Sequence, residues 1–322
     1  MTENRSLSTK EAADILGVSK NTVYEFIKRG ELPSYRVGRK VRIDLNDIEY
    51  YKNKSRSNKV HTTEFQSISN VSYEKPSPKN LHNTSKLKDG FIICGQDMIL
   101  DILTRYLDMH PNGTQAFRYY TGSYNGLVEL YKGNVTVASA HLWDGETKKY
   151  NIPYVRRLLP GIPCIIIHLV CRMEGFYVAK GNPKNITSWS DLTKSNIKMV
   201  NRERGCGVRV LIDEHLRNLN ISSKFIQGYE EEELSHLAVA SAVARGAADV
   251  GIGNEKTALQ VDGIEFIPIQ KENYDLIIKK EDLDNPVFQT LIAIINSKEF
   301  KLEIQGIGGY DISETGKIIA EI

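Results

Sequence analysis

Four short segments combine glycine with small polar residues at positions where a strand is expected to end and a helix to begin. They are CGQDMIL, TGSYNGLVEL, SAHLW and NRERGCGVRVLIDEHL, which start at Cys94, Thr121, Ser139 and Asn201. At the start of a helix the backbone N–H groups are free and the positive end of the helix dipole faces outward, which favours anionic or polar ligands. If the four segments meet at one cleft, they form a small-molecule binding site.

Near the amino end, the spacing of polar and apolar residues predicts two short helices joined by a tight turn. Ser8 and Glu11 form a capping-box pattern, followed by the apolar residues Ala12, Ile15 and Leu16 and then by Gly17. Ser19 is placed to cap a second helix, in which Val23, Phe26 and Ile27 form one apolar face. This arrangement is typical of a helix-turn-helix.

The side chains expected on the outer face of the second helix suit contact with DNA. These are Ser19, Lys20, Asn21, Thr22, Tyr24 and Lys28. Short polar side chains match base edges and basic ones match phosphates. The next segment, SYRVGRKVRID, alternates around Gly38 like a hairpin, and its basic residues Arg36, Arg39, Lys40 and Arg42 predict a wing that grips a groove or the DNA backbone.

The segment STKEAADILGVSKNTVYEFIKRGELPSYRVGRKVRIDLNDIEYY closely resembles the excisionase-type, MerR-related winged helix-turn-helix domain. The resemblance extends through the wing motif G-E-L-P-x-x-R-V-G-R-x-x-R-I. It implies DNA contacts from the recognition helix around Asn21, Thr22 and Tyr24 and from the wing around Arg39. A basic surface that is merely solvated is the simpler alternative.

After residue 89, apolar runs of strand length alternate with amphipathic stretches of helical length. The runs include FIICG, VTVAS, PCIIIHLV, GFYVAKG, DVGIG and FIPI. Such alternation predicts an α/β domain with a largely parallel sheet. Residues 54–88 are rich in Ser, Asn and Lys and predict a linker. We therefore expect a DNA-binding domain over residues 1–53, the linker over 54–88 and an effector domain over 89–322.

The effector region resembles the cytoplasmic periplasmic-binding-protein-like domain related to molybdate-binding proteins. The segments that carry the resemblance include GSYNGLVELYKGNVTVASAHL, VNRERGCGVR, SHLAVASAVARGAADVGIG and GGYDISETG. The resemblance implies a type 2 fold with lobe I at about 89–175 and 272–322, lobe II at about 176–271, and a ligand between them. It implies a ligand site formed by Gly95, Gln96, Gly122, Ser123, Ser139, Asn201, Arg202, Gly205, Cys206, Gly207, Arg209 and Tyr274.

One departure from that family bears on the ligand. Relatives tend to have Gly-Ser-Gly-Thr-Arg where this chain has Gly205-Cys206-Gly207-Val208-Arg209, so two hydroxyl donors are lost. An oxyanion needs many donors, so molybdate or tungstate is one candidate and a different small ligand is another. Cys206 is either a packing residue or a thiol whose pKa is lowered by nearby Arg204 and Arg209.

Composition and motifs exclude several classes of protein. The net charge is +2, and residues 1–60 contain 13 Lys and Arg against 8 Asp and Glu. We therefore expect the basic amino-terminal end to bind a polyanion. The sequence shows no membrane span, and the four cysteines have no zinc-site or disulfide spacing. His141 and His236 have no second metal ligand beside them in sequence, and no catalytic motif occurs. We expect no metal, no cofactor and no enzyme activity.

These features together predict a cytoplasmic, DNA-binding transcriptional regulator that senses a small ligand. A homodimer is expected, because one short recognition helix makes few base contacts and paired half-sites multiply them. One alternative is an excisionase-like architectural or recombination factor, which does not require an intact ligand cleft. Another is a ligand store whose DNA-binding domain has no function.

Overall fold

The computed structural model describes residues 6–29, 32–38, 40–45, 47–48, 51 and 90–322. Contacts divide the chain into two units, residues 1–77 and 78–322, each of which is described by itself. The expected linker, 54–88, lies outside the described residues, and the division between the units falls within it.

The amino-terminal unit is a helix-turn-helix followed by a hairpin. Its elements are β1 (Ser6–Ser8), α1 (Thr9–Leu16), α2 (Lys20–Lys28), β2 (Tyr35–Val37) and β3 (Lys40–Asp44). The three strands form an antiparallel sheet in the order β1-β3-β2. Seven buried apolar side chains form its core: Leu7, Ala12, Ala13, Val23, Leu32, Ile43 and Ile48. Ile15, expected on the buried stripe of α1, is instead 37% exposed.

Local capping defines both helices of this unit. The Ser8 Oγ accepts a hydrogen bond from the Glu11 N–H, and a Glu11 carboxylate oxygen accepts one from the Ser8 N–H at 2.7 Å. Gly17 ends α1 with a φ of +67°, a conformation that a side chain disfavours. The Ser19 Oγ accepts from the Thr22 N–H at the start of α2. The turn is therefore set by side chains within a few residues of it.

The carboxyl-terminal unit alternates strands and helices. Its strands are β4 (Phe91–Cys94), β5 (Ala116–Tyr119), β6 (Val137–Ala140), β7 (Trp143–Asp144), β8 (Lys149–Tyr150), β9 (Cys164–Ala179), β10 (Asn201–Arg202), β11 (Glu232–Glu233), β12 (Val250–Asn254), β13 (Ile264–Lys279) and β14 (Ile318–Glu321). Its α-helices are α4 (Ile99–Met109), α5 (Ser123–Tyr131), α6 (Ile152–Leu158), α7 (Gly207–Asn218), α8 (His236–Ala244), α9 (Glu255–Ala258), α10 (Pro286–Asn296) and α11 (Lys298–Ile307). Short 3-10 turns lie at Trp189–Thr193, Ser223–Phe225 and Lys280–Asp282.

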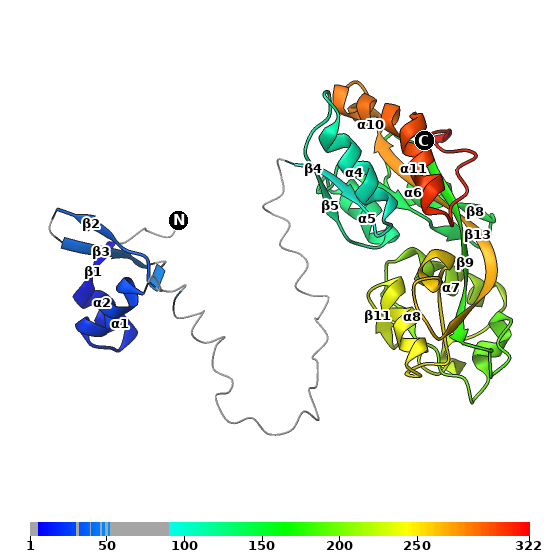
Figure 1. The fold of residues 1–322 in the computed structure, drawn as a ribbon, viewed down its shortest axis with the longest axis horizontal. Helices are drawn as coiled ribbons and strands as arrows, with labels where there is room; N and C mark the ends of the chain where they lie inside the picture. Colours follow the sequence, from blue (N-terminus) through cyan, green and yellow to red (C-terminus); the bar gives the residue numbers. More distant parts are fainter. Residues whose placement is uncertain (1–5, 30–31, 39, 46, 49–50, 52–89) are drawn as a thin grey trace. The chain divides into compact units, whose positions relative to one another are not determined.

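Two long strands join two lobes (Figure 1). β9 and β13 pair antiparallel along their 16-residue lengths, with irregularities at Pro268/Gln270 and at Tyr274/Asp275. In lobe I they continue into β6, β4 and β5, of which β4 pairs in parallel with both neighbours. In lobe II the edge of the same sheet is β12, antiparallel to β9. The sheet is therefore mixed rather than largely parallel.

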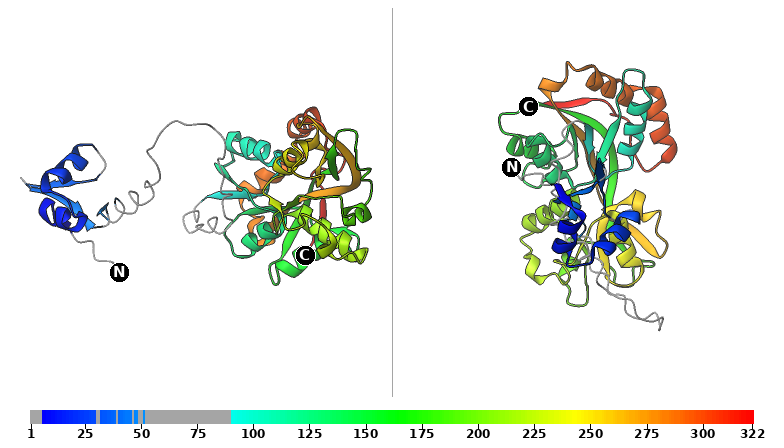
Figure 2. Two further views of the ribbon diagram at one scale, coloured as in Figure 1. Left: turned by 90° about the horizontal axis from the view of Figure 1, so that it is seen from below. Right: turned by 90° about the vertical axis from the view of Figure 1, so that its left-hand side faces the viewer.

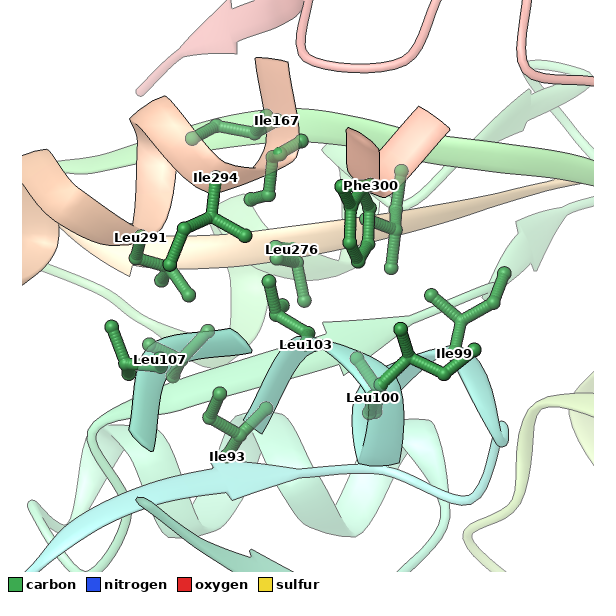
Figure 3. Packing of buried hydrophobic residues seen from close by; sticks show 14 of the residues in the cluster. Ile93, Ile99, Leu100, Leu103, Leu107, Ile167, Leu276, Leu291, Ile294 and Phe300 are labelled. Atoms are coloured by element: carbon green, nitrogen blue, oxygen red, sulfur yellow. The ribbon is translucent and has the colours of Figure 1, made fainter. Parts of the chain in front are cut away.

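Each lobe has its own apolar core. In lobe I, α4, α10 and α11 pack together over the sheet, and Leu103, Leu276 and Phe300 meet between them (Figures 2 and 3). In lobe II, α7 packs Val208, Ile212 and Leu216 against the sheet. Of the described helices, none has the length and apolar character needed to cross a membrane.

Candidate functional site

The predicted recognition helix presents its polar side chains to solvent. Lys20, Asn21, Tyr24 and Lys28 of α2 are exposed, whereas Val23 is buried. Ser19 is exposed but its Oγ lies 2.8 Å from the Thr22 Oγ1 and also caps the helix. Ser19 and Thr22 therefore hold the start of α2, and the exposed side chains beyond them are available to a partner.

The predicted wing is the β2–β3 hairpin. Lys40 is exposed and Arg42 is partly exposed on β3. Arg36 lies on β2, where its backbone pairs with that of Val41, and Arg39 lies outside the described residues. The hairpin thus carries basic residues beside the recognition helix, in the same unit.

The carboxyl-terminal unit contains a cavity of about 970 Å³ between the lobes. Lobe I lines it with residues that include Gln96, Asp97, Tyr119, Gly122 and Tyr310, and lobe II with residues that include Glu203, Leu234, His236 and Asn254. At one end lies a smaller recess lined by Gly95, Gln96, Asp97, Thr121, Gly122, Ser123, Ser139, His141, Arg172, His236 and Tyr274. Six of the twelve predicted ligand residues line this recess: Gly95, Gln96, Gly122, Ser123, Ser139 and Tyr274.

The floor of the recess is formed by Asp97 and Arg172, which belong to a buried charge cluster not expected from the sequence that also contains Glu174 and Glu272. Arg172 of β9 makes short ion pairs with Asp97 and Glu272, and its Nη2 lies 3.9 Å from a Glu174 oxygen. Its guanidinium also stacks over the Tyr274 ring, 4.6 Å from the centroid. All four charged side chains are buried. Three carboxyl groups around one cation make this floor unusual for a site that binds an anion.

Two groups at the floor have strongly shifted pKa values. Burial, reinforced by the charge of Glu272, raises the pKa of Glu174 well above its ordinary value. Neither Glu174 oxygen accepts a hydrogen bond from the described residues. Burial, together with the charges of Arg202 and Arg172, lowers the pKa of His236 well below its ordinary value. Glu174 thus favours the neutral acid, and His236 the neutral imidazole.

The same floor holds a set of atoms spaced for a metal ion. A ring nitrogen of His141 and one oxygen each of Glu174 and Glu272 lie within 4.8 Å of one another. Spacing along the chain does not reveal this set, because the three residues come from three separate segments. The Arg172 guanidinium pairs with Glu272 and lies 3.9 Å from a Glu174 oxygen, so a positive group already stands beside both carboxyl groups.

Hydroxyl groups complete the recess. The Ser139 Oγ donates to the Cys94 carbonyl at 2.9 Å and lies 2.7 Å from the Tyr274 hydroxyl. The Ser123 Oγ accepts from the His141 N–H at 3.3 Å. Ser123, Ser139 and Tyr274 therefore place three hydroxyl groups along the lining of the recess, two of which lie within hydrogen-bond distance of each other.

The predicted helix-start residues of lobe II, Gly205, Cys206 and Gly207, contact lobe I directly and do not line the recess. The Gly205 carbonyl accepts from the Tyr124 N–H at 3.0 Å, so the start of α5 meets the loop before α7. A Cβ added to Gly122 would lie 2.4 Å from the Cys206 Cα, and one added to Gly207 would lie 2.4 Å from the His141 ring. The lobes are therefore closed, and some helix-start N–H groups are already used.

Cys206 caps α7 rather than acting as an activated thiol. Its Sγ accepts from the Arg209 N–H at 3.3 Å, and the side chain is only 2% exposed. Burial outweighs the charge of Arg202 and raises the pKa of the Cys206 thiol to about 12. The hypothesis of a lowered thiol pKa at this position is therefore wrong, and the packing alternative fits the structure.

Three further predicted residues support the lobe II side of the cleft from behind. Asn201 donates to the Tyr229 carbonyl at 3.0 Å, and Arg209 pairs with Glu232 at 2.9 Å. Arg202 donates from Nη2 to the Gln96 side-chain oxygen at 2.8 Å, which joins the two lobes. None of the three lines the cavity or the recess.

An aromatic stack, not expected from the sequence, also joins the lobes. The His215 ring of α7 lies between Trp143 of lobe I, at 4.3 Å, and Trp189 of lobe II, at 4.4 Å. The His215 Nε2 lies 2.7 Å from the Gln270 side-chain oxygen. Burial lowers the pKa of His215, so the neutral ring is favoured between the two indoles.

Comparison with known proteins agrees with this architecture. A family model described as a PBP superfamily domain matches residues 104–296, and a helix-turn-helix domain model matches residues 6–56. The uncharacterized protein YvgK of Bacillus subtilis (strain 168) is 39% identical over 324 residues, covering 100% of both chains. An uncharacterized protein from the 5′ region of a 2Fe-2S ferredoxin gene of Clostridium pasteurianum is 59% identical over 113 residues, covering 35% of this chain and 100% of that one.

Solved structures show the same fold at low sequence identity. A substrate-binding protein of a phosphate ABC transporter from Clostridium perfringens, with bound phosphate, has a TM-score of 0.52 at 13% identity. The similarity covers 69% of this chain and 99% of that one. Both resemblances expected from the sequence are thereby confirmed. The chain therefore belongs to the PBP superfamily, and it carries a helix-turn-helix domain ahead of its two-lobed domain.

Proposed function

We propose that this protein is a cytoplasmic transcriptional regulator that binds duplex DNA and responds to a small ligand held between its lobes. The observation that supports this most is the presence, on one chain, of a helix-turn-helix with an exposed polar face and a two-lobed domain with a cavity and a polar recess between its lobes. Ligand binding between lobes favours closure, and closure converts binding into a change of shape.

In this proposal α2 enters the major groove and the hairpin grips the backbone. Lys20, Asn21, Tyr24 and Lys28 contact bases and phosphates, Ser19 and Thr22 hold the helix start, and Arg36, Arg39, Lys40 and Arg42 form the wing. A homodimer places two such helices on paired half-sites.

The ligand site comprises the recess and the adjoining cavity. Ser139, Tyr274 and Gln96 supply hydrogen bonds, and the buried Arg172 cluster sets the charge of the floor. Molybdate and tungstate are oxyanions to test, yet Arg172 is already paired with carboxyl groups and the Gly205 loop has lost two hydroxyl donors. These observations favour a neutral or amine-bearing ligand over an oxyanion.

DNA binding is tested with the full chain on a duplex selected from a random library. The double variant Lys20→Ala, Asn21→Ala is compared with Lys10→Ala, an exposed residue of α1 that is not on the predicted contact face. The double variant should bind at least tenfold more weakly and show a shallower dependence on salt, whereas Lys10→Ala should bind like the parent chain. Equal binding by all three proteins would refute the DNA contact surface.

Ligand sensing is tested by thermal unfolding of the full chain with molybdate, tungstate, phosphate, neutral polyols and amines. A ligand at 100 times its Kd stabilises the folded state by about 2.7 kcal/mol. Any stabilising compound is then added to the DNA-binding assay, where it should change affinity. A compound that stabilises the chain but leaves DNA affinity unchanged would support the ligand-store alternative instead.

A further inference from the structure

A cysteine, a histidine and an aspartate form a hydrogen-bonded row on β9 and β13, away from the recess. The Cys171 Sγ donates to the Asn273 Oδ1 at 3.2 Å and lies 3.6 Å from the His168 Nε2, and the His168 Nδ1 lies 2.8 Å from an Asp275 oxygen. The second Asp275 oxygen accepts from the Asn151 amide at 2.6 Å. A thiol is activated in this way when a nucleophilic sulfur, a base and a carboxylate that orients the base follow one another.

An irregularity in the strand pairing allows this row to form. Residues three apart on a regular strand point to opposite faces. Here Cys171 pairs with Asn273 and His168 with Asp275, so two residues of β9 stand opposite Tyr274 alone. The bulge changes the alternation and brings His168 and Cys171 together, as bulges near functional sites do. Arg172, the next residue along β9, instead lines the recess.

The surroundings hold the histidine in its charged form. His168, Asp275 and Asn151 are all at most 2% exposed. Burial opposes protonation of His168, but hydrogen bonds to Asp275 and Cys171 outweigh it and raise its pKa to about 9. From the carboxyl-terminal segment, Glu314 interacts electrostatically with His168, and the Asp311 backbone pairs with that of Cys171. At neutral pH the Nε2–H of an imidazolium therefore faces the sulfur.

The other three cysteines provide an internal contrast. Cys94, Cys164 and Cys206 are buried, whereas Cys171 is partly exposed. Burial raises the pKa of the Cys94 and Cys206 thiols to about 12 and that of Cys164 to about 11. A thiol must be both accessible and ionised to react, and Cys171 alone among the four combines exposure with a cationic partner.

We propose that Cys171 is a redox-modifiable site that reacts with hydroperoxides. The thiolate attacks one peroxide oxygen, the O–O bond breaks as an S–O bond forms, and His168 gives its Nε2 proton to the departing oxygen. The cysteine is oxidised by two electrons to the sulfenic acid, and the hydroperoxide is reduced to an alcohol or to water. The site is separate from the ligand recess, and the inference does not depend on the proposed function.

The test exposes the full chain to hydrogen peroxide in the presence of a 1,3-dione that traps sulfenic acid, with mass spectrometry of each cysteine. Cys171 should be labelled at least tenfold faster than the other three. His168→Asn should slow that labelling at least tenfold, whereas the control Cys164→Ser should leave it unchanged. Equal labelling of Cys171 and Cys164, or no effect of His168→Asn in a chain that retains its melting temperature, would overturn the proposal.

A second measurement needs no variant. At one pH, the labelling rate of Cys171 in the folded chain is compared with its rate in urea. The folded chain should be labelled at least tenfold faster, because His168 lies beside the sulfur only when β9 and β13 are paired. Equal rates in the folded chain and in urea would refute activation by His168. Faster modification of Cys171 by glutathione disulfide than by hydrogen peroxide would refute the proposal that hydroperoxides are its oxidants.

Discussion

Replacing Glu174 with glutamine should stabilise the protein at neutral pH, although it removes a carboxyl group from a buried cluster. The folded protein holds the Glu174 proton because burial and Glu272 raise its pKa, whereas an unfolded chain releases it near pH 4.3. The contribution of protonated Glu174 to the free energy of unfolding is therefore fully present below about pH 4.3. It falls by about 1.4 kcal/mol per pH unit above that, until the pH reaches the folded-state pKa. At pH 7 the loss is at most roughly 4 kcal/mol.

Glutamine has nearly the same shape as protonated glutamate and cannot release a proton, so Glu174→Gln should recover most of this loss. We expect a gain of roughly 1 to 4 kcal/mol at pH 7 and a correspondingly higher melting temperature. The difference should disappear near pH 4. Thermal unfolding of the full chain from pH 4 to 8 measures it, with the exposed Glu146→Gln as the control. Destabilisation by Glu174→Gln at pH 7, or a gain that does not depend on pH, would refute the reasoning.

Three further substitutions test the structure. Ser8→Ala removes the capping box of α1 and should cost the amino-terminal unit about 1 kcal/mol, measured by its thermal transition. Gly306→Ala places a methyl group in open space within α11 and should stabilise the chain by about 0.4 to 1 kcal/mol in urea unfolding. Gly122→Ala forces the start of α5 away from Cys206, so the Tyr124 amide, which donates to Gly205, should exchange with deuterium faster; unchanged exchange would mean that the lobes are not held by this contact.

The amino-terminal unit was largely predictable because its determinants are local. The cap residues Ser8 and Ser19 lie within three residues of the N–H groups that they accept from, so their pattern is visible in the sequence. Exposure of Ile15 was not predictable from spacing, because the small residue Ala13 takes the buried position on α1 instead.

The ligand cleft was predictable only in part. Gly95 follows β4 and lies in the recess as the glycine-polar pattern indicates, whereas Ser139 reaches the recess from within β6, and the segment after it leads into β7 instead of a helix. Arg172 and Glu272 were missed because they lie on opposite strands, 100 residues apart, and pair only after those strands come together. A signal was present: apart from His168 the rest of β9 is apolar or Cys, and a buried strand accommodates Arg172 and Glu174 only if partners for them exist elsewhere.

The two long strands also affect the order in which this protein can be made. Lobe I combines β4, β5 and β6 with α10, α11 and β14, so its core contains both Leu103 and Phe300. During synthesis the first part of lobe I leaves the ribosome well before the segment that completes its sheet, with all of lobe II produced in between. Such distant pairings slow folding and leave apolar surface uncovered for longer. Strand β13 is thus the first segment whose synthesis lets a growing chain pair β9 with β6 through one sheet shared by both lobes.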